Sequence, residues 1–437
     1  MTTKERVEGM LSPYRVLDLT DEKGLLCGKP LGDLGADVIK VEKPGGDAAR
    51  EIGPFYHDEI DREKSLFWFA FNTSKRGITL DIEKAKGKEI LKRLVRNVDF
   101  VIESFPPGYL DGLGLGYADL EKVNPGVIMV SITPFGQSGP YRDYKAPGIV
   151  AWAMGGQMYP VGKVGHPPVQ ISHHAQAYLH GSVEAAVGSM VALYHRRMTC
   201  EGQHVDLSIQ SSLAQATYML TSSWEMSQNI KKQEEQRDET TAVMKILMPT
   251  MLWPCKDGYV MWFFYTGEAA RRRNPPLVEW MDSEGMATDG MKEFDWDNFS
   301  LQPTPETEEL TPEERRELFR ARLQILEEPT SNFFMSHTMA ELMDGAVKHR
   351  VTLYPLNSTA AILESAQLAA RGFWVEVEHP ELGTTITYPG AFTQASETPP
   401  GISRRPPLIG EHNQEVYQQE LGMTEGEIQS LEQAGVI

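Results

Sequence analysis

The N-terminal part of the chain alternates short, continuously apolar runs with stretches of helical period. The apolar runs cover 14–19, 36–42, 77–81, 100–103 and 127–131, and the helical patterns cover 25–34, 84–97 and 116–124. Strands that are buried on both faces have such continuous apolar runs, and the strand–helix–strand order is typical of a parallel sheet covered by helices. The sequence therefore predicts an α/β fold with a doubly wound parallel sheet.

The loops that follow these strands are the expected ligand-binding region, because a doubly wound sheet binds its ligand beyond the carboxyl ends of its strands. Three of the four loops, 42–44, 104–108 and 134–140, contain glycine or proline, and the fourth is 20–23. Lys43, Lys75 and Lys145 lie on or near this rim. Neither a G-x-G-x-x-G nor a Walker A motif is present, which argues against an ordinary dinucleotide or P-loop site.

A glycine-rich turn meets a long helical pattern at 173–181, and such junctions often carry the chemistry of α/β proteins. Apolar and small residues recur at helical spacing over 183–194. The junction reads HHAQAYLHG and contains no acidic residue.

The composition restricts the possible functions and locations. The chain has 437 residues, of which 41% are hydrophobic, so it can form more than one structural unit. Its 42 basic and 61 acidic residues give a net charge of −19, which disfavours general binding to nucleic acids or anionic membranes. It has no membrane-spanning apolar run and no signal sequence, and its three cysteines lack metal-ligand spacing. We therefore expect a cytoplasmic protein with free thiols and no metal site.

Several motifs in a fixed order carry a family resemblance. They are VLDLTDEKGLLCGKPLGDLGADVIKVEKPGGD at 16–47, NTSKRGITLD at 72–81, FPPGYLDGLGLGYADLEKVNPGVIMVSITPFGQSGP at 105–140, VALYHRRMTCEGQHVDLSI at 191–209, YPLNSTAAILESAQLAARGFWVEVEHPELG at 354–383 and RPPLIGEHNQEVY at 405–417. This set resembles the class III CoA-transferases, the family of formyl-CoA transferase and carnitine CoA-transferase. The resemblance covers both ends of the chain and is weak at about 225–330.

The resemblance implies an interlocked dimer. Each chain of the family forms a large Rossmann-like domain from both termini and a smaller domain from its middle, and each active site lies between domains of different chains. We therefore expect a large domain from 1–220, a linker at 221–245, a small domain at 246–375, and a return linker with the C-terminal part of the large domain at 376–437. The acidic, proline-containing stretch 281–312 is expected to be a solvated loop.

Active members of the family use an aspartate just before the long helix as a nucleophile. A carboxylate is needed because it attacks an acyl-CoA thioester to form a mixed anhydride, which CoA thiolate converts into an aspartyl-CoA thioester. Counting from Lys145 without a gap puts Ala177 at this position, and a second acidic position of the family falls at Gly148. A shift of one residue brings in Gln176 or Tyr178, and neither is a carboxylate. The resemblance therefore implies no catalytic residue at this site.

The family's contacts with coenzyme A are only partly present. Lys43, Lys75, Phe105 and Lys145 match contact positions, with Phe105 in the loop near the adenine and Lys145 at a phosphate. The resemblance thus implies coenzyme A as a ligand.

Three departures weaken that implication. Gly112 replaces a basic residue that reaches the CoA phosphates, and Ser104 replaces an asparagine. The stretch 248–254 lacks the glycine run that covers the site in the family. Losing one charge-assisted contact removes about 1–3 kcal/mol, so CoA is expected to bind weakly or not at all.

Together these features indicate a catalytically silent subunit of a heteromeric class III CoA-transferase. The opening at 21–47 resembles the non-catalytic subunit of benzylsuccinate-specific members, which implies CoA transfer from succinyl-CoA to a dicarboxylic, benzylsuccinate-like acid. The implied partner is a homologous catalytic subunit in an interlocked heterodimer or heterotetramer.

Two alternatives remain open, because fold alone does not decide function. An acyl-CoA isomerase or lyase on this fold could use His173, His174 or Glu184. A non-enzymatic regulator could bind CoA or an acyl-CoA without turnover.

Overall fold

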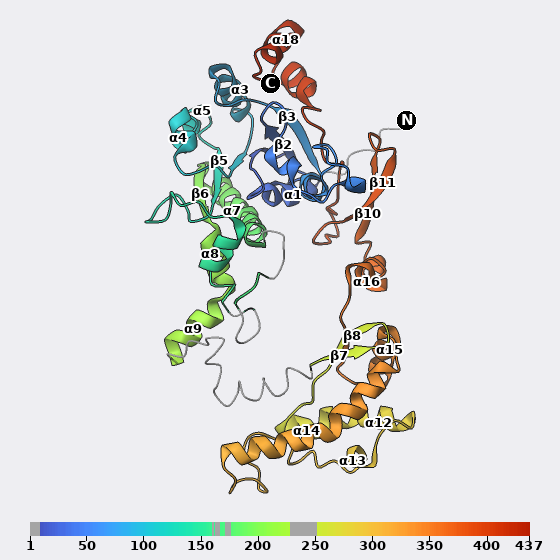
Figure 1. Ribbon diagram of the computed structural model, residues 1–437. Coiled ribbons are helices and arrows are strands. Elements are labelled where there is room, and N and C mark those ends of the chain that lie inside the picture. Colours follow the sequence, from blue (N-terminus) through green and yellow to red (C-terminus); the bar gives the residue numbers. More distant parts are fainter. Residues whose placement is uncertain (1–8, 160, 162–166, 171–175, 228–250) are drawn as a thin grey trace. The chain divides into compact units, whose positions relative to one another are not determined.

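The computed structural model describes residues 9–159, 161, 167–170, 176–227 and 251–437 (Figure 1). The candidate bases His173 and His174 lie outside the described residues, as do most of the expected 221–245 linker and the first part of 248–254. The chain divides into two compact units, one formed by Met1–Gln233 with Gln367–Ile437 and the other by Glu234–Ala366.

The first unit is built on a six-stranded parallel sheet with the strand order β3-β2-β1-β4-β5-β6. The strands are β1 (Arg15–Leu19), β2 (Asp37–Glu42), β3 (Lys75–Thr79), β4 (Phe100–Glu103), β5 (Ile128–Thr133) and β6 (Gln203–Ser208). The predicted doubly wound α/β fold is therefore confirmed. In this order the winding reverses between β1 and β4, so the topological switch point lies between their carboxyl ends.

Helices cover both faces of this sheet. Up to residue 227 the helical segments are α1 (Leu25–Asp33), η1 (Ala48–Glu51), η2 (Tyr56–Asp58), α2 (Leu66–Asn72), α3 (Ala85–Val95), α4 (Tyr109–Leu113), α5 (Tyr117–Val123), α6 (Gly148–Met154), α7 (Gln176–Thr199), α8 (Ile209–Ala216) and α9 (Tyr218–Ser227). Neighbouring residues of a strand point to opposite faces. Leu17 accordingly joins a core with α3 and α5, while Val16 joins a second core with α1 and α7.

The helix α3 shows how the sequence specifies these covering elements. Its buried residues Ile90, Leu91, Leu94 and Val95 recur at helical spacing and form one apolar face. Basic residues occupy the last turn, where they interact favourably with the negative end of the helix dipole. This helix begins and ends within two residues of the predicted range.

The segment that follows residue 400 covers the free edge of β3. The amide of Gly77 donates to Nδ1 of His412 at 3.1 Å, and the amide of Thr79 donates to Oδ1 of Asn413 at 2.9 Å. The buried hydroxyl of Tyr417 donates to the carbonyl of Thr79. The edge strand is therefore protected from pairing with another chain. The remaining elements of this part are α17 (Ala366–Ala370), the β10 (Trp374–His379) and β11 (Thr384–Pro389) hairpin, η5 (Gln414–Glu420) and α18 (Glu425–Gln433).

The second unit packs helices and a small antiparallel sheet around an aromatic core. The sheet has the order β7-β8-β9. The core contains Trp262, Phe264, Phe319 and Phe333, all essentially inaccessible to solvent. The elements are β7 (Leu252–Cys255), β8 (Gly258–Met261), η4 (Gly267–Ala269), α11 (Ala270–Arg273), α12 (Pro275–Ser283), α13 (Asp289–Lys292), α14 (Pro312–Met335), α15 (Met339–His349), β9 (Tyr354–Pro355) and α16 (Thr359–Leu363).

The expectation that 281–312 is a solvated loop is wrong in part. Met281, Met291 and Phe299 from this stretch are fully buried in the core of the second unit. The acidic residues lie outside: the side chain of Asp289 is 95% exposed. The stretch therefore buries its apolar side chains in the core and exposes its acidic side chains to solvent. Its acidic composition alone does not indicate the buried residues.

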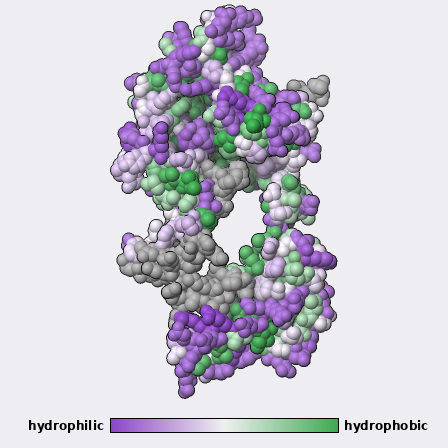
Figure 2. Space-filling view, in the orientation of Figure 1, coloured by the Kyte–Doolittle hydropathy of each residue, from purple (hydrophilic) through white to green (hydrophobic). Residues whose placement is uncertain are grey.

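The molecular surface carries the excess charge of the chain. Figure 2 shows a face on which hydrophilic residues predominate and apolar residues form separate patches. No helix among the described residues is both long enough and apolar enough to cross a membrane.

Candidate functional site

Two cavities open at the carboxyl ends of the central strands, beside the switch point of the sheet. Ser104 and Phe105, which directly follow β4, line both of them. The first cavity also touches the ends of β1 and β2, and the second reaches the loop before α6 and the first turn of α7. This is the region in which a doubly wound sheet binds its ligand.

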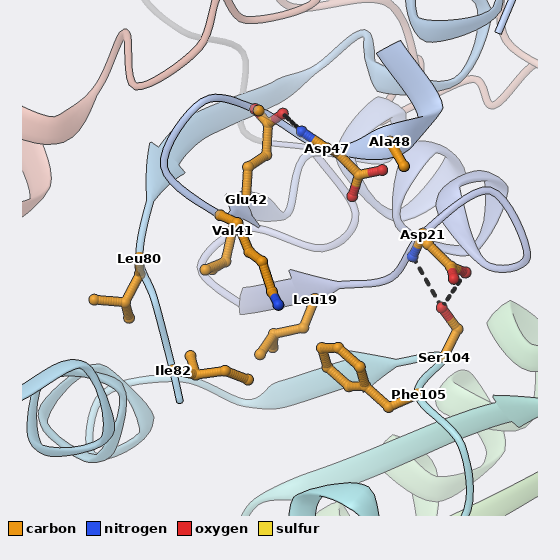
Figure 3. A pocket seen from close by; sticks show the side chains of 12 residues that line it. Leu19, Asp21, Val41, Glu42, Asp47, Ala48, Leu80, Ile82, Ser104 and Phe105 are labelled. Carbon is orange, nitrogen blue, oxygen red and sulfur yellow. Dashed lines mark hydrogen bonds between the residues drawn. The ribbon is translucent and has the colours of Figure 1, made fainter. Parts of the chain in front are cut away.

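The first cavity has a volume of about 210 Å³ and is mainly apolar. Figure 3 shows the side chains of Leu19, Ile82 and Phe105 directed into the same space, with Leu80 beside them. The ring of Phe105 stacks on Tyr109 with centroids 4.8 Å apart, which fixes its orientation. An apolar slot with an aromatic wall suits a flat heterocyclic ring.

The second cavity has a volume of about 470 Å³ and carries more charge. Its lining includes Glu22, Lys23 and Lys145, together with Tyr178 from the first turn of α7. The hydroxyl of Tyr178 donates to the carbonyl of Ala146 at 3.2 Å, and burial raises its pKa to about 12. Tyr178 is therefore a neutral, anchored wall of this cavity at physiological pH.

A hydrogen-bonded bridge lies where the two cavities meet. The amide of Asp21 donates to Oγ of Ser104 at 2.9 Å, and the Ser104 hydroxyl donates to Oδ1 of Asp21 at 2.7 Å (Figure 3). The ammonium of Lys23 pairs with the other oxygen of the Asp21 carboxylate. The hydroxyl of Ser182 on α7 donates to the carbonyl of Lys23 at 3.0 Å. These contacts hold the loop after β1 against both β4 and α7.

Three of the four predicted CoA contacts line these cavities. Lys43 and Phe105 line the first cavity, and Phe105 and Lys145 line the second. The Nζ of Lys43 lies 2.8 Å from Oε1 of Glu83, but the two side chains are 59% and 51% exposed. Since exposed ion pairs contribute little, Lys43 is available to an anionic ligand. Lys145 forms no ion pair with any described residue.

Lys75 does not lie on the rim, contrary to the expectation from the sequence. β3 begins at Lys75 rather than at Gly77, so the residue belongs to the sheet and its side chain is fully buried. Its ammonium donates to Oδ2 of Asp18 at 2.8 Å, to the carbonyl of Leu25 at 2.8 Å and to Oδ1 of Asn72 at 3.0 Å. With these interior partners, Lys75 stabilises the fold and does not contact a ligand in either cavity.

Asp18 is the centre of a buried ionic cluster, which we call the Asp18 cluster and which comprises Asp18, Thr20, Lys40 and Lys75. The hydroxyl of Thr20 donates to Oδ1 of Asp18 at 2.6 Å, and all four side chains are inaccessible to solvent. Burial alone would raise the pKa of Asp18, but the ammonium groups of Lys75 and Lys40 outweigh burial and lower it. Asp18 is therefore an ionised structural residue.

Ala177 and Gly148 occupy positions next to the second cavity. Ala177 lies in the first turn of α7, is 1% exposed, and packs in the apolar core beneath that helix. Gly148 is the buried first residue of α6. The cavity beside α7 is thus present, while the described start of the helix carries no carboxylate that could attack a thioester.

Glu22 lines the second cavity, although sequence reasoning did not single it out. Burial raises the pKa of its carboxyl, the neighbouring Asp21 carboxylate raises it further, and Lys23 opposes both. No other described residue forms a hydrogen bond or ion pair with its side chain. The signal that could have revealed Glu22 is its place directly after β1, because the ends of β1 and β4 converge at the switch point.

Glu103 is a second acid with a strongly shifted pKa, at the carboxyl end of β4. It is 4% exposed, and its Oε2 accepts a hydrogen bond from the amide of Phe105 at 2.7 Å. Ser131 on β5 also bonds to its carboxyl, and the Ser131 Oγ lies 2.8 Å from Nε2 of His204 on β6. Burial raises the pKa of Glu103 to about 7, so its charge changes near neutral pH directly behind the shared wall of both cavities.

Of the three groups suggested for an isomerase or lyase, Glu184 alone lies among the described residues. Glu184 lies on α7 but lines neither cavity. Residues 252–254 of the stretch that lacks a glycine run belong to β7. Within the described part of the chain, no group of three or more His, Cys, Asp or Glu residues could hold a metal ion.

Comparisons with known proteins agree with this fold. The sequence profile of CoA-transferase family III matches residues 11–413. The chain is 33% identical over 428 residues to the succinyl-CoA:(R)-benzylsuccinate CoA-transferase subunit BbsE of Thauera aromatica, with 98% of each chain covered. It is 29% identical over 429 residues to the succinyl-CoA–L-malate CoA-transferase beta subunit of Chloroflexus aurantiacus, again with 98% of each covered.

Among solved structures, a CAIB/BAIF family protein from Brucella suis superimposes with a TM-score of 0.75 and 25% sequence identity. The match covers 94% of this chain and 99% of the other. The chain therefore belongs to CoA-transferase family III, whose members act on CoA thioesters.

Proposed function

We propose that this chain is a catalytically silent subunit of a heteromeric CoA-transferase that moves CoA from succinyl-CoA to a dicarboxylic acid resembling benzylsuccinate. The observation that carries the proposal is Ala177 in the first turn of α7, beside the second cavity. The methyl group of alanine cannot form the acyl anhydride on which the family's reaction depends. Gly148 likewise supplies no second carboxyl group.

The two cavities support binding of CoA by this chain. The apolar slot beside Phe105 suits the adenine, and Lys43 and Lys145 suit the phosphates. A side chain at Gly112 would meet nothing within 4 Å, so there is room for the basic residue that this chain lacks. We therefore expect affinity for CoA lower than that of an active subunit, with the nucleotide held mainly by Phe105 and the two lysines.

An exposed apolar surface supports a protein partner. Val187, Val191 and Tyr194 on α7 are 58%, 65% and 71% exposed, and they line an apolar groove of about 590 Å³ between α7 and α1. Contiguous exposed apolar side chains often mark a site of protein–protein contact. Because two relatives are named as subunits, we infer that a homologous chain with an intact aspartate covers this groove.

On the same basis we propose the interlocked arrangement of the two chains. Residues 1–220 and 376–437 would form the large domain, 221–245 the linker and 246–375 the small domain. The small domain would complete the site of the partner, so this chain could support catalysis without its own nucleophile.

The test is succinyl-CoA consumption with benzylsuccinate as acceptor, by the full chain alone and by the chain co-expressed with a homologue that carries the aspartate. Activity only in the complex, lost when the homologue's aspartate becomes asparagine, supports the silent-subunit function. Turnover by the chain alone contradicts it and favours the isomerase or lyase alternative. CoA binding without turnover in either preparation favours the regulator.

A matched pair of variants tests the partner surface. Val187→Asp places a charge in the apolar groove and is expected to abolish co-purification with the homologue. Lys86→Asp changes an exposed residue of α3 and is expected to leave co-purification unchanged. Equal recovery of the two variants would exclude the α7 groove as the interface.

A further inference from the structure

Among the described residues that line the second cavity, Glu22 is the acid whose carboxyl forms no hydrogen bond or ion pair with another described residue. The other acid of this cavity, Asp143, receives a hydrogen bond at 3.1 Å from Nε of Arg142 and is 76% exposed. Glu22 is instead partly buried, and burial is the main reason that its pKa is raised. A carboxylate in such a place is poorly solvated, so a second negative charge nearby is unfavourable.

Two cations of this cavity have acidic neighbours. Lys23 pairs with Asp21, and Arg142 pairs with Asp143. Lys145 remains, and in the proposed function it binds a phosphate of CoA. Among the described lining residues this leaves Arg142 as the cation nearest to unpaired, and the exposed Asp143 beside it offsets its charge.

The acyl end of a bound thioester belongs in this cavity. The family's nucleophile stands at the position of Ala177, and the thioester carbon must come within reach of that position in active members. The next residue, Tyr178, lines the second cavity together with Glu22. A thioester bound in the family's manner therefore brings its acyl group to the side of the cavity that Glu22 lines.

We propose that Glu22 makes this chain's own cavity reject CoA thioesters whose acyl group ends in a carboxylate, so that the site accepts free CoA or a neutral acyl-CoA. This inference rests on the proposed binding of CoA and names the class of thioester that the silent site takes. Its consequence is that the silent subunit does not sequester succinyl-CoA or the dicarboxylic product while its partner turns them over.

The rejection depends on pH, because it requires the ionised form of Glu22. As the pH falls through the raised pKa of Glu22, the carboxyl gains a proton and the repulsion disappears. The ionisable groups that face Glu22 from its own loop and from the neighbouring elements are Asp21, Lys23, Asp47, Arg142, Asp143, Lys145 and Tyr178.

The test is titration calorimetry of the full chain with CoA, butyryl-CoA and succinyl-CoA, which differ in the charge of the acyl end. At pH 8 the wild-type chain should bind succinyl-CoA about tenfold more weakly than butyryl-CoA, a ratio in the range expected for one like-charge contact in a partly desolvated site. Glu22→Gln should bring the two affinities within about twofold of each other by removing that contact. Glu184→Gln removes the same charge from α7 outside the cavity and should keep the tenfold ratio.

Each outcome separates this inference from the proposed function. If wild type binds CoA but does not distinguish butyryl-CoA from succinyl-CoA, Glu22 has no selective role, while the CoA site stands. If neither CoA nor either thioester binds, the CoA site and the inference both fail. If the chain is stable only with its homologue, the same titrations are made on the wild-type complex and on the complex that carries Glu22→Gln. A change in the ratio of succinyl-CoA to butyryl-CoA affinity between the two complexes then comes from this chain's cavity. An unchanged ratio overturns the inference.

Discussion

Asp18 and Glu22 are four residues apart, at the end of β1 and in the loop that follows, yet they face opposite environments. Asp18 is fully buried with two lysines and a hydroxyl group around it, and these cations lower its pKa despite burial. Glu22 lines a cavity, its carboxyl forms no hydrogen bond or ion pair with another described residue, and burial raises its pKa. The charge of the Asp18 carboxylate is neutralised by groups of the protein. The Glu22 carboxylate instead faces a cavity, where it can interact with a ligand.

The comparison extends to the lysines. Lys75 has three hydrogen-bond acceptors inside the first unit, whereas Lys145 lines the second cavity and has no described ion-pair partner. We therefore expect interior charges to determine stability and cavity charges to determine ligand binding. Each prediction that follows separates these two effects.

The largest change, a loss of folding stability, is expected from Lys75→Met. Removing the ammonium leaves Asp18 buried with only Lys40 as a cation, and breaking a buried pair in this way costs about 3–5 kcal/mol. Urea unfolding followed by circular dichroism measures the loss. Lys43→Met is the matched control, because it removes a lysine from an exposed pair and should cost less than about 1 kcal/mol. Similar values for the two variants would contradict a structural role for Lys75.

A smaller and pH-dependent effect is expected from Glu103→Gln. The pKa of Glu103 is about 7 in the folded chain and 4.5 in its ordinary state, so folding favours the protonated form. The protonated Glu103 makes its full contribution to the stability of the wild-type chain at pH 4.5 and below. This contribution is lost as the pH rises through 7. The variant cannot ionise, and it should gain about 1–3 kcal/mol relative to wild type between pH 5 and pH 8.5.

Unfolding at the two pH values tests this difference. Glu121→Gln, an exposed change on α5, should show no relative gain. A gain of equal size in both variants would mean that the effect comes from net charge rather than from the buried position of Glu103.

The smallest effect is expected from Lys145→Met, and it should appear in binding alone. The exposed lysine would lose one contact with a phosphate, so CoA should bind about five- to tenfold more weakly, or about 1 kcal/mol. The difference should shrink at high salt, and stability should change by less than about 0.5 kcal/mol. Calorimetric titration with CoA tests it, with Lys122→Met on α5 as the control outside both cavities. Unchanged affinity in Lys145→Met would remove this residue from the proposed site.

The sheet could be predicted from the sequence because its strands are continuous apolar runs. A strand buried on both faces tolerates few polar residues, so a run such as 127–131 is recognisable as a strand. The same rule explains the error at Lys75. A charged residue at the start of an apolar run is easily assigned to a loop. Only the position of Asp18 on β1, two strands away in the sheet, reveals that the charge of Lys75 is neutralised in the interior.

Two further features depended on folding rather than on local pattern. Glu22 belongs to loop 20–23, where a ligand is expected, but its place in the wall of the second cavity depends on the ends of β1 and β4 coming together. Phe299 lies among acids and prolines, and its burial follows from stacking on Phe319 of α14, with ring centroids 4.5 Å apart. Contacts between distant segments decide both cases, and a sequence window does not contain them.

The segment that covers β3 also affects how the molecule is made. Tyr417 bonds to Thr79 across 338 positions, and the whole second unit lies between them in the chain. During synthesis the second unit can fold while the covering residues are still inside the ribosome. The edge of β3 stays unprotected until those residues emerge, and exposed edges invite aggregation.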